Sequence, residues 1–122
     1  LVIVTAALTL AVIVPTSGYA SNLIATTLRD YEQSLFTDAV RRNLKDPYSA
    51  VFSNLIAFRD KSSRAIHVCG YVNAKNSFGG YVGNRIFYGM SSYGRDGKLE
   101  PKEPFVTIDE MLAANFADKF CR

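Results

Sequence analysis

The run AIHVCGYVNAKNSFGGYVGNRIFYGMSSY, residues 65–93, carries the strongest signal for the architecture of this chain. In its first ten residues, apolar side chains recur at every second position, as Ile66, Val68 and Val72 do, which is the period of a β-strand. The residues KNSFGG (75–80) are small and polar and predict a connection, and residues 81–93 predict the next strand. Because the connection is short, the two strands are expected to run antiparallel. Gly83 and Gly89 are each expected to mark a bulge or a close approach of backbone.

The neighbouring segments extend this pair of strands into a small sheet flanked by helices. The run SAVFSNLIAFR predicts a further strand at Ala50–Arg59, followed by the polar turn DKSS. Together, the three strands predict an antiparallel meander.

Residues 25–45 carry apolar side chains mostly at three- and four-residue steps, which predicts a helix before the strands. Thr27 and Asp30 are expected to form its capping box, and Asp46 before Pro47 is expected to end it. After a polar loop at residues 94–104, Thr107 and Glu110 form a second capping-box pattern, which predicts a helix at the end of the chain. The predicted fold class is α+β, with an N-terminal helix, a three-stranded antiparallel meander and a C-terminal helix, both helices covering one face of the sheet.

The chain contains two cysteines, Cys69 and Cys121. In an oxidising compartment such a pair is most simply a disulfide, and its loop of roughly fifty residues would contribute about 4 kcal/mol in the chain-entropy model. The alternative is two unrelated buried thiols. Two cysteines so far apart, with one histidine, make a poor metal site, and no metal or cofactor is expected.

The first twenty residues resemble a secretory signal peptide. LVIVTAALTLAVIV (1–14) is largely apolar and uncharged, and PTSGYA (15–20) places Gly18 and Ala20 at the −3 and −1 positions of a cleavage site. A basic n-region and an initiator Met are missing, which suggests that the true start lies upstream. We therefore expect a signal peptide at residues 1–20, a single α+β domain at residues 21–122 and a periplasmic or secreted protein. The alternatives are a retained membrane anchor and a core helix or strand.

Charge patterning gives the most useful functional signal. Between Lys61 and Arg95 the chain carries five cations and no Asp or Glu, and the whole chain has a net charge of +3. Tyrosines, phenylalanines and asparagines are interleaved with these cations. Cations pair with anions, aromatic rings stack, and amides both donate and accept, so the pattern predicts a binding surface. The predicted binding residues are Lys75, Asn76, Tyr81, Arg85 and Tyr88. The alternative is an ordinary solvated sheet face with some of the aromatic rings in the core.

The partners that suit such a surface behind a signal peptide are an anionic envelope polymer, a glycan, lipid headgroups or an acidic protein. Nucleic acid is not expected there. Membrane association is expected only if the N-terminal segment is retained.

No catalytic constellation stands out in the sequence. GGYVG lacks the spacing of a dinucleotide fingerprint and the Gly-Lys-Ser/Thr of a phosphate-binding loop. His67 and Cys69 would share a strand face, so the alternative to a non-enzymatic binding module is a small secreted enzyme that uses His67 with a nearby thiol or hydroxyl. A further alternative is an envelope component anchored by an uncleaved N-terminal segment.

Two blocks, LKDPYSAVF (44–52) and CGYVNAKNSFGGYVGNRIFYG (69–89), resemble a pattern of small exported proteobacterial proteins of unassigned function. Its form is K-D-P-x-S-A-x-F followed by C-G-x-V-N-A-K-N-S-x-G-G-Y-x-G. The resemblance implies an exported bacterial protein and brings no catalytic residue with it.

Overall fold

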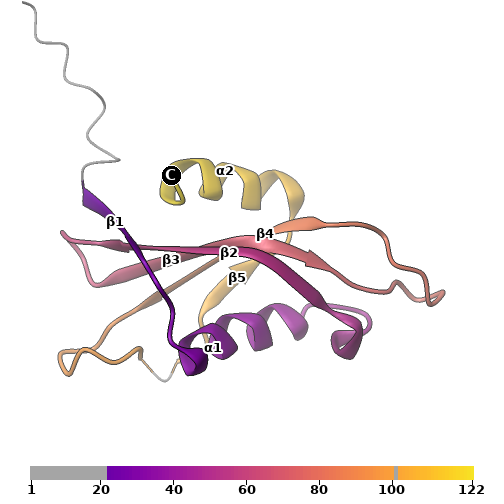
Figure 1. Cartoon of the computed structure of the whole chain (residues 1–122), viewed down its shortest axis with the longest axis horizontal. Helices are drawn as coiled ribbons and strands as arrows, with labels where there is room; N and C mark the ends of the chain where they lie inside the picture. Colours follow the sequence, from indigo (N-terminus) through magenta and orange to yellow (C-terminus); the bar gives the residue numbers. More distant parts are fainter. Residues whose placement is uncertain (1–21, 101) are drawn as a thin grey trace, which may run out of the picture.

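The computed structural model describes residues 22–100 and 102–122 and shows an α+β protein with two α-helices and a five-stranded antiparallel sheet (Figure 1). The elements follow in the order β1 (Leu23–Thr26), α1 (Asp30–Arg41), the short 3-10 helix η2 (Pro47–Ser49), β2 (Val51–Asp60), β3 (Ala65–Asn73), β4 (Arg85–Ser92), β5 (Phe105–Thr107) and α2 (Glu110–Phe120). The predicted signal peptide, residues 1–20, lies outside the described residues.

The strands pair with their neighbours in sequence, so the sheet is a meander in the order β1-β2-β3-β4-β5. The prediction of an antiparallel meander is confirmed for β2, β3 and β4, but the predicted number of three strands is wrong. The two additional strands lie at the sheet edges and are only four and three residues long. Runs this short cannot display a period of two, so sequence patterning gave no signal for either of them.

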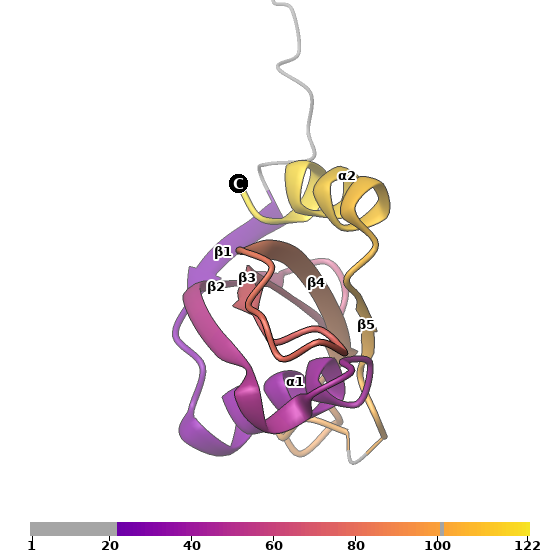
Figure 2. The same ribbon diagram turned by 90° about the vertical axis from the view of Figure 1, so that its right-hand side faces the viewer.

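The two helices cover opposite faces of the sheet, as the end-on view in Figure 2 shows. Phe36 and Val40 of α1 pack with Val68 and Phe87 in one buried cluster. The residues that follow these two strand positions, Cys69 and Tyr88, point to the other face and pack with Ala113, Phe116 and Phe120 of α2. The prediction that both helices cover one face is therefore wrong. Consecutive strand side chains alternate between faces, so β3 and β4 each contribute to two cores.

Both helices begin later than predicted. The N-cap of α1 is Arg29, whose backbone N–H donates to Glu32 Oε1 at 3.0 Å, so the predicted box of Thr27 and Asp30 is not the one used. Likewise, the N-cap of α2 is Asp109, whose Oδ1 accepts from the N–H of Leu112 at 2.9 Å. Each predicted start was too early because a short strand precedes each helix.

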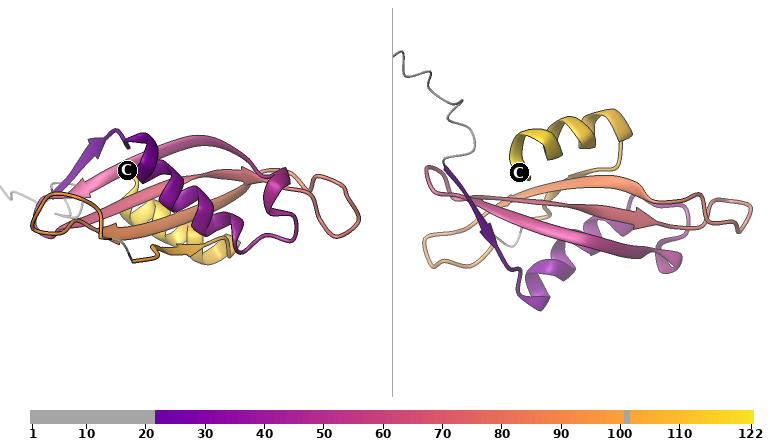
Figure 3. Two further views of the ribbon diagram at one scale, coloured as in Figure 1. Left: turned by 90° about the horizontal axis from the view of Figure 1, so that it is seen from below. Right: turned by 45° about the horizontal axis from the view of Figure 1, so that its top comes forward.

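The long strands give the sheet two distinct ends. The hairpin end is where β3 leads into β4 through residues 74–84, a loop that extends past both helices (Figure 3). The opposite end holds the β2–β3 turn at residues 61–64 and the loop that follows β4. Gly89 lies between these ends, and a Cβ there would meet Phe36 Cδ1 at 2.7 Å, so its predicted role in a close approach is confirmed.

Candidate functional site

Three segments that are distant in the sequence meet at the hairpin end. They are the residues after α1, the helix η2 and the β3–β4 loop. The backbone N–H of Lys75 donates to Ser49 Oγ at 2.8 Å, and the Tyr81 hydroxyl donates to Ser49 O at 3.1 Å. A β-bridge between Lys75 and Tyr81 holds the two sides of the loop together. These contacts give the hairpin end a defined shape.

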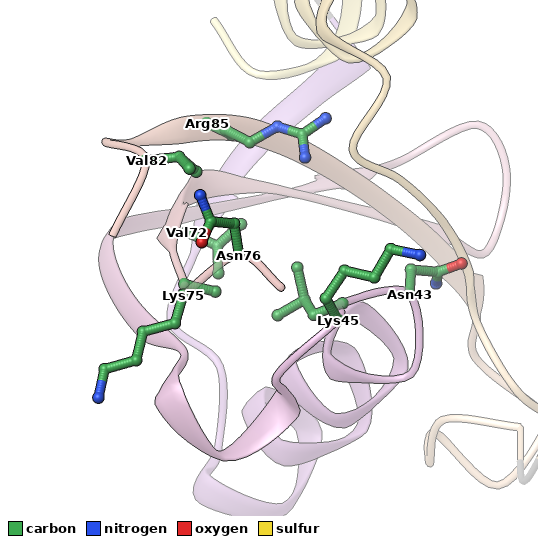
Figure 4. A pocket seen from close by; sticks show the side chains of 9 residues that line it. Asn43, Lys45, Val72, Lys75, Asn76, Val82 and Arg85 are labelled. Carbon is green, nitrogen blue, oxygen red and sulfur yellow. The ribbon is translucent and has the colours of Figure 1, made fainter. Parts of the chain in front are cut away.

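The meeting point encloses a cavity of about 270 Å³ (Figure 4). It is lined by Asn43, Leu44, Lys45, Val72, Ala74, Lys75, Asn76, Val82 and Arg85. In Figure 4, Lys45 and Asn43 come from the segment after α1, and Arg85 lies on the facing wall. The side chain of Lys75 extends away from both, so its ammonium group stands at the rim.

The lining of the cavity is basic. It contains three cations, Lys45, Lys75 and Arg85, and no acidic residue. The ion pairs found in the described part of the chain are Arg41 with Asp38, Arg42 with Glu103 and Arg122 with Asp118. None of them involves Lys45, Lys75 or Arg85, so among the described residues no carboxylate forms a salt bridge with a cation of the cavity.

Two of the cations are held in place by weaker contacts that leave their charge available. Arg85 Nη2 donates to Ile108 O at 3.2 Å, which orients the guanidinium and uses one of its donors. Lys75 Nζ lies 5.6 Å from the centre of the Tyr81 ring, a cation–π geometry that retains the positive charge.

The loop that carries Asn76 is closed by this residue itself. Asn76 Oδ1 accepts from the N–H groups of Phe78, at 2.9 Å, and Gly80, at 3.2 Å. The Asn76 N–H donates to Gly80 O at 2.8 Å. Its side-chain Nδ2 faces Val82 in Figure 4, where it can donate to a bound acceptor.

Of the five predicted binding residues, Lys75, Asn76 and Arg85 line the cavity, and Tyr81 packs beside Lys75. Tyr88 does not join them, because it is buried under α2 with 1% of its surface exposed. The cavity also contains Lys45, which sequence reasoning missed as a site residue, as it did Asn43. Thirty residues separate Lys45 from Lys75, and only the return of β3 to the end of α1 brings them together.

The acid-free span of the sequence does not form one continuous surface. Lys61 and Arg64 lie in the β2–β3 turn, and Arg95 follows β4, so these three cations are at the opposite end of the sheet from Lys75 and Arg85. The backbone confirms this placement, since the Tyr93 N–H donates to Arg64 O at 2.8 Å. The predicted surface is therefore divided between two ends of the molecule.

Tyr88 belongs instead to an aromatic cluster around His67. The Tyr88 hydroxyl lies 2.6 Å from His67 Nδ1, and the imidazole stacks on Phe120 with ring centres 4.2 Å apart. Burial raises the pKa of the Tyr88 phenol above its usual range. Burial also lowers the pKa of His67, an effect that the negative charge of Asp60 partly opposes. The pair is thus held neutral at pH 7, with the phenol able to donate to an unprotonated Nδ1.

Cys69 and Cys121 form a disulfide, with 6.3 Å between their Cα atoms, as predicted. An enzyme that used His67 together with the thiol of Cys69 would need that thiol to be free. The disulfide leaves Cys69 with no free thiol, so this alternative fails. A disulfide in a small domain is consistent with an extracellular or periplasmic location. Within residues 22–100 and 102–122, no group of three or more His, Cys, Asp or Glu side chains is arranged to hold a metal ion.

Comparison with known proteins adds no relative: no family model matches the chain, and neither a curated protein nor a solved structure matches it. Among the described residues, none of the helices has the length and apolar character needed to span a membrane.

Proposed function

We propose that this chain is an exported, non-enzymatic binding protein that holds an anionic group, a phosphate or a carboxylate, in the cavity at the hairpin end. One observation carries the proposal: Lys45 and Arg85 face each other across one partly enclosed space, Lys75 stands at its rim, and the lining contains no acidic residue. Such clefts concentrate anions because their low-dielectric walls focus the field of the charges.

The chemistry of the lining suits an oxyanion. The guanidinium of Arg85 presents a planar fork of donors that can pair with two oxygens of one phosphate or carboxylate. Lys45 faces it across the cavity, and the Nδ2 group of Asn76 can donate a further hydrogen bond. Val72, Val82 and other aliphatic residues complete the lining and give it an apolar part.

The size of the cavity points to a small group. Pockets for drug-sized ligands measure about 300 to 1,000 Å³, and this cavity of about 270 Å³ lies just below that range. It therefore suits a headgroup, or the end of a polymer chain, better than a whole organic cofactor.

Two observations support a binding role rather than a catalytic one. The single histidine is buried, with 2% of its surface exposed, and pairs with a phenol of raised pKa instead of a carboxylate. Cys69 is bonded in the disulfide and has no free thiol.

Three features support export to the periplasm or beyond the cell. They are the apolar segment at residues 1–14, the PTSGYA cleavage pattern and the disulfide. Membership of the small exported proteobacterial proteins that share the K-D-P-x-S-A-x-F pattern is part of this proposal.

The proposal is tested by reversing two charges in the cavity and two outside it. The cavity variant is Lys45→Glu with Arg85→Glu, and the control is Lys61→Glu with Arg64→Glu at the opposite end. Each replaces one lysine and one arginine, so both change the net charge by the same amount. Glycerol phosphate is titrated into each protein, and the dissociation constant is measured by NMR.

We expect millimolar binding in the wild type, which corresponds to about 4 kcal/mol. Losing two charge-assisted contacts of about 1.5 kcal/mol each reduces affinity by about a hundredfold, so the cavity variant shows no measurable binding. The control variant retains binding within a few fold. Equal loss in both variants would show that only net charge matters and would refute a specific site. The melting temperature of each variant verifies that it is folded.

A further inference from the structure

Large apolar side chains are fully exposed around the cavity. Phe78, at the tip of the β3–β4 loop, has 97% of its surface exposed, and Tyr48 in η2 has 100% exposed. Tyr81 and Val82, on the return side of the loop, are also exposed. The two segments are adjacent in space, because Ser49 bonds to both Lys75 and Tyr81. The hairpin end therefore presents an aromatic and aliphatic tip on the part of the molecule that projects farthest (Figure 3).

The tip is closed by hydrogen bonds within its own loop. Four hydrogen bonds close the loop: two accepted by Asn76 Oδ1, one from Asn76 N–H to Gly80 O at 2.8 Å, and one from Gly79 N–H to Asn76 O at 3.1 Å. Gly79 has a φ of +80°, which lets the chain turn tightly after Phe78. The ring of Phe78 is thus held out in solvent by its own loop, and ordering it costs little on binding.

Cations lie beside this apolar tip. The ammonium group of Lys75 points outward from the cavity rim (Figure 4), and Lys45 and Arg85, which line the cavity, are both exposed. Residues 47–49 and 74–84 contain no Asp or Glu. Asp46 is the one acidic residue within residues 42–49 and 74–84, and it does not line the cavity. Asp109 and Glu110, at the start of α2, follow Ile108, whose carbonyl accepts from Arg85, and they do not line the cavity either.

We propose that the hairpin end docks on an anionic lipid surface, with Phe78 inserted at the boundary between headgroups and acyl chains. Tyr48 and Tyr81 are then at the level of the headgroups, where aromatic rings with a polar end prefer to lie. Lys75 pairs with lipid phosphates at the surface, and the cavity receives the phosphate of one lipid. This inference rests on the proposed function, and it identifies the bound anion as the phosphate of a membrane lipid. It does not depend on residues 1–14.

The arrangement favours lipid over a glycan. A sugar-binding site stacks aromatic rings against the faces of the sugar, but the lining of this cavity contains no aromatic residue. Phe78 and Tyr48, whose side chains are almost fully exposed, lie outside this lining, where they are free to insert into a soft surface. Peripheral membrane proteins commonly bind through two effects: apolar side chains insert into the bilayer interface, and lysines are attracted to anionic lipids.

The test uses the absence of tryptophan from the sequence. Phe78→Trp in the full chain places a single tryptophan, the tip tryptophan, at the end of the β3–β4 loop. Ser63→Trp places one, the control tryptophan, in the exposed turn at the opposite end. Each protein is mixed with vesicles of phosphatidylcholine alone, or of phosphatidylcholine with phosphatidylglycerol. Because the signal is local, it reports insertion of the tip even if residues 1–14 also attach the chain to the vesicle.

We expect the emission of the tip tryptophan to shift to shorter wavelength and to become protected from iodide only with the anionic vesicles, while that of the control tryptophan stays unchanged. Adding Lys75→Glu to the Phe78→Trp protein should weaken the vesicle affinity by more than about tenfold. Unchanged emission of the tip tryptophan with anionic vesicles would overturn the inference, as would equal shifts at both positions. A shift with soluble polygalacturonate but not with vesicles would overturn it in favour of a glycan.

The glycerol phosphate titration separates this inference from the proposed function. Phosphate binding in the cavity without a shift of the tip tryptophan on vesicles leaves the proposed function standing and refutes lipid docking. Absence of phosphate binding from the wild-type chain refutes the proposed function itself, and with it the part of this inference that places a lipid phosphate in the cavity.

Discussion

Breaking the disulfide should remove a large part of the stability of this domain. Cys69 lies in the middle of β3 and Cys121 directly follows α2, so the bond fixes the C-terminal helix to its face of the sheet. The cysteines are 52 residues apart. A closed loop of that length lowers the entropy of the unfolded chain by about 14 cal/mol/K, which corresponds to about 4 kcal/mol at 25 °C. The total stability of a small domain is about 5 to 15 kcal/mol, so this loss brings the domain close to unfolding.

The assay is urea denaturation of three samples: the oxidised wild type, the wild type with dithiothreitol, and the variant Cys69→Ala with Cys121→Ala. With a slope of about 1 to 3 kcal/mol per molar urea, the expected loss lowers the midpoint by more than about 1 M. The reduced wild type keeps the same side-chain atoms, so it separates the effect of the cross-link from the effect of lost sulfur packing. A loss below about 1 kcal/mol in the reduced sample would refute the argument from loop closure.

Two further predictions concern the two cores. Gly89→Ala should destabilise the domain by about 1 to 3 kcal/mol, because the new Cβ would lie 2.7 Å from Phe36 Cδ1. The control is Gly80→Ala, whose Cβ would meet no atom closer than 3.9 Å, and equal urea midpoints for the two variants would contradict the close approach. Burial lowers the pKa of His67 in the folded state, so the unfolded chain binds the proton more readily and stability falls as the pH drops below about 6.5. Because His67 is the only histidine, His67→Phe should reduce the change in melting temperature between about pH 7.5 and about pH 5.5, and an unchanged difference would disprove the assignment.

The long elements of the fold could be predicted from the sequence because each is long enough to show its period. The alternation in β3 and the helical spacing of Phe36 and Val40 are clear signals of this kind. The edge strands β1 and β5 could not be predicted from patterning, since neither is long enough to alternate.

The placement of the helices on opposite faces could have been predicted from the position of Cys69 in its strand. Cys69 alternates with Val68, so it points away from the face that Val68 helps to cover. A disulfide from Cys69 to Cys121 therefore requires α2 to lie on the Cys69 face, opposite α1.

The site could be predicted only in part, for a different reason. Lys75, Asn76 and Arg85 lie close together in the sequence, and their type was enough to suggest anion binding. Lys45 joins them only through the tertiary return of β3, which no local pattern encodes. Tyr88 was misplaced because a tyrosine in a strand gives the same pattern whether it faces solvent or a second core, and the cover supplied by Phe116 and Phe120 is a long-range contact.

We propose above all that the anion binds in the cavity at the hairpin end, and that residues from both walls of this cavity take part in binding it. The most direct measurement is an amide chemical-shift map of the wild-type chain during titration with glycerol phosphate. We expect saturable changes that are largest at Lys45, Lys75, Asn76 and Arg85, on both walls of the cavity. Changes that do not saturate, or that are largest in the turn at residues 61–64, would contradict it.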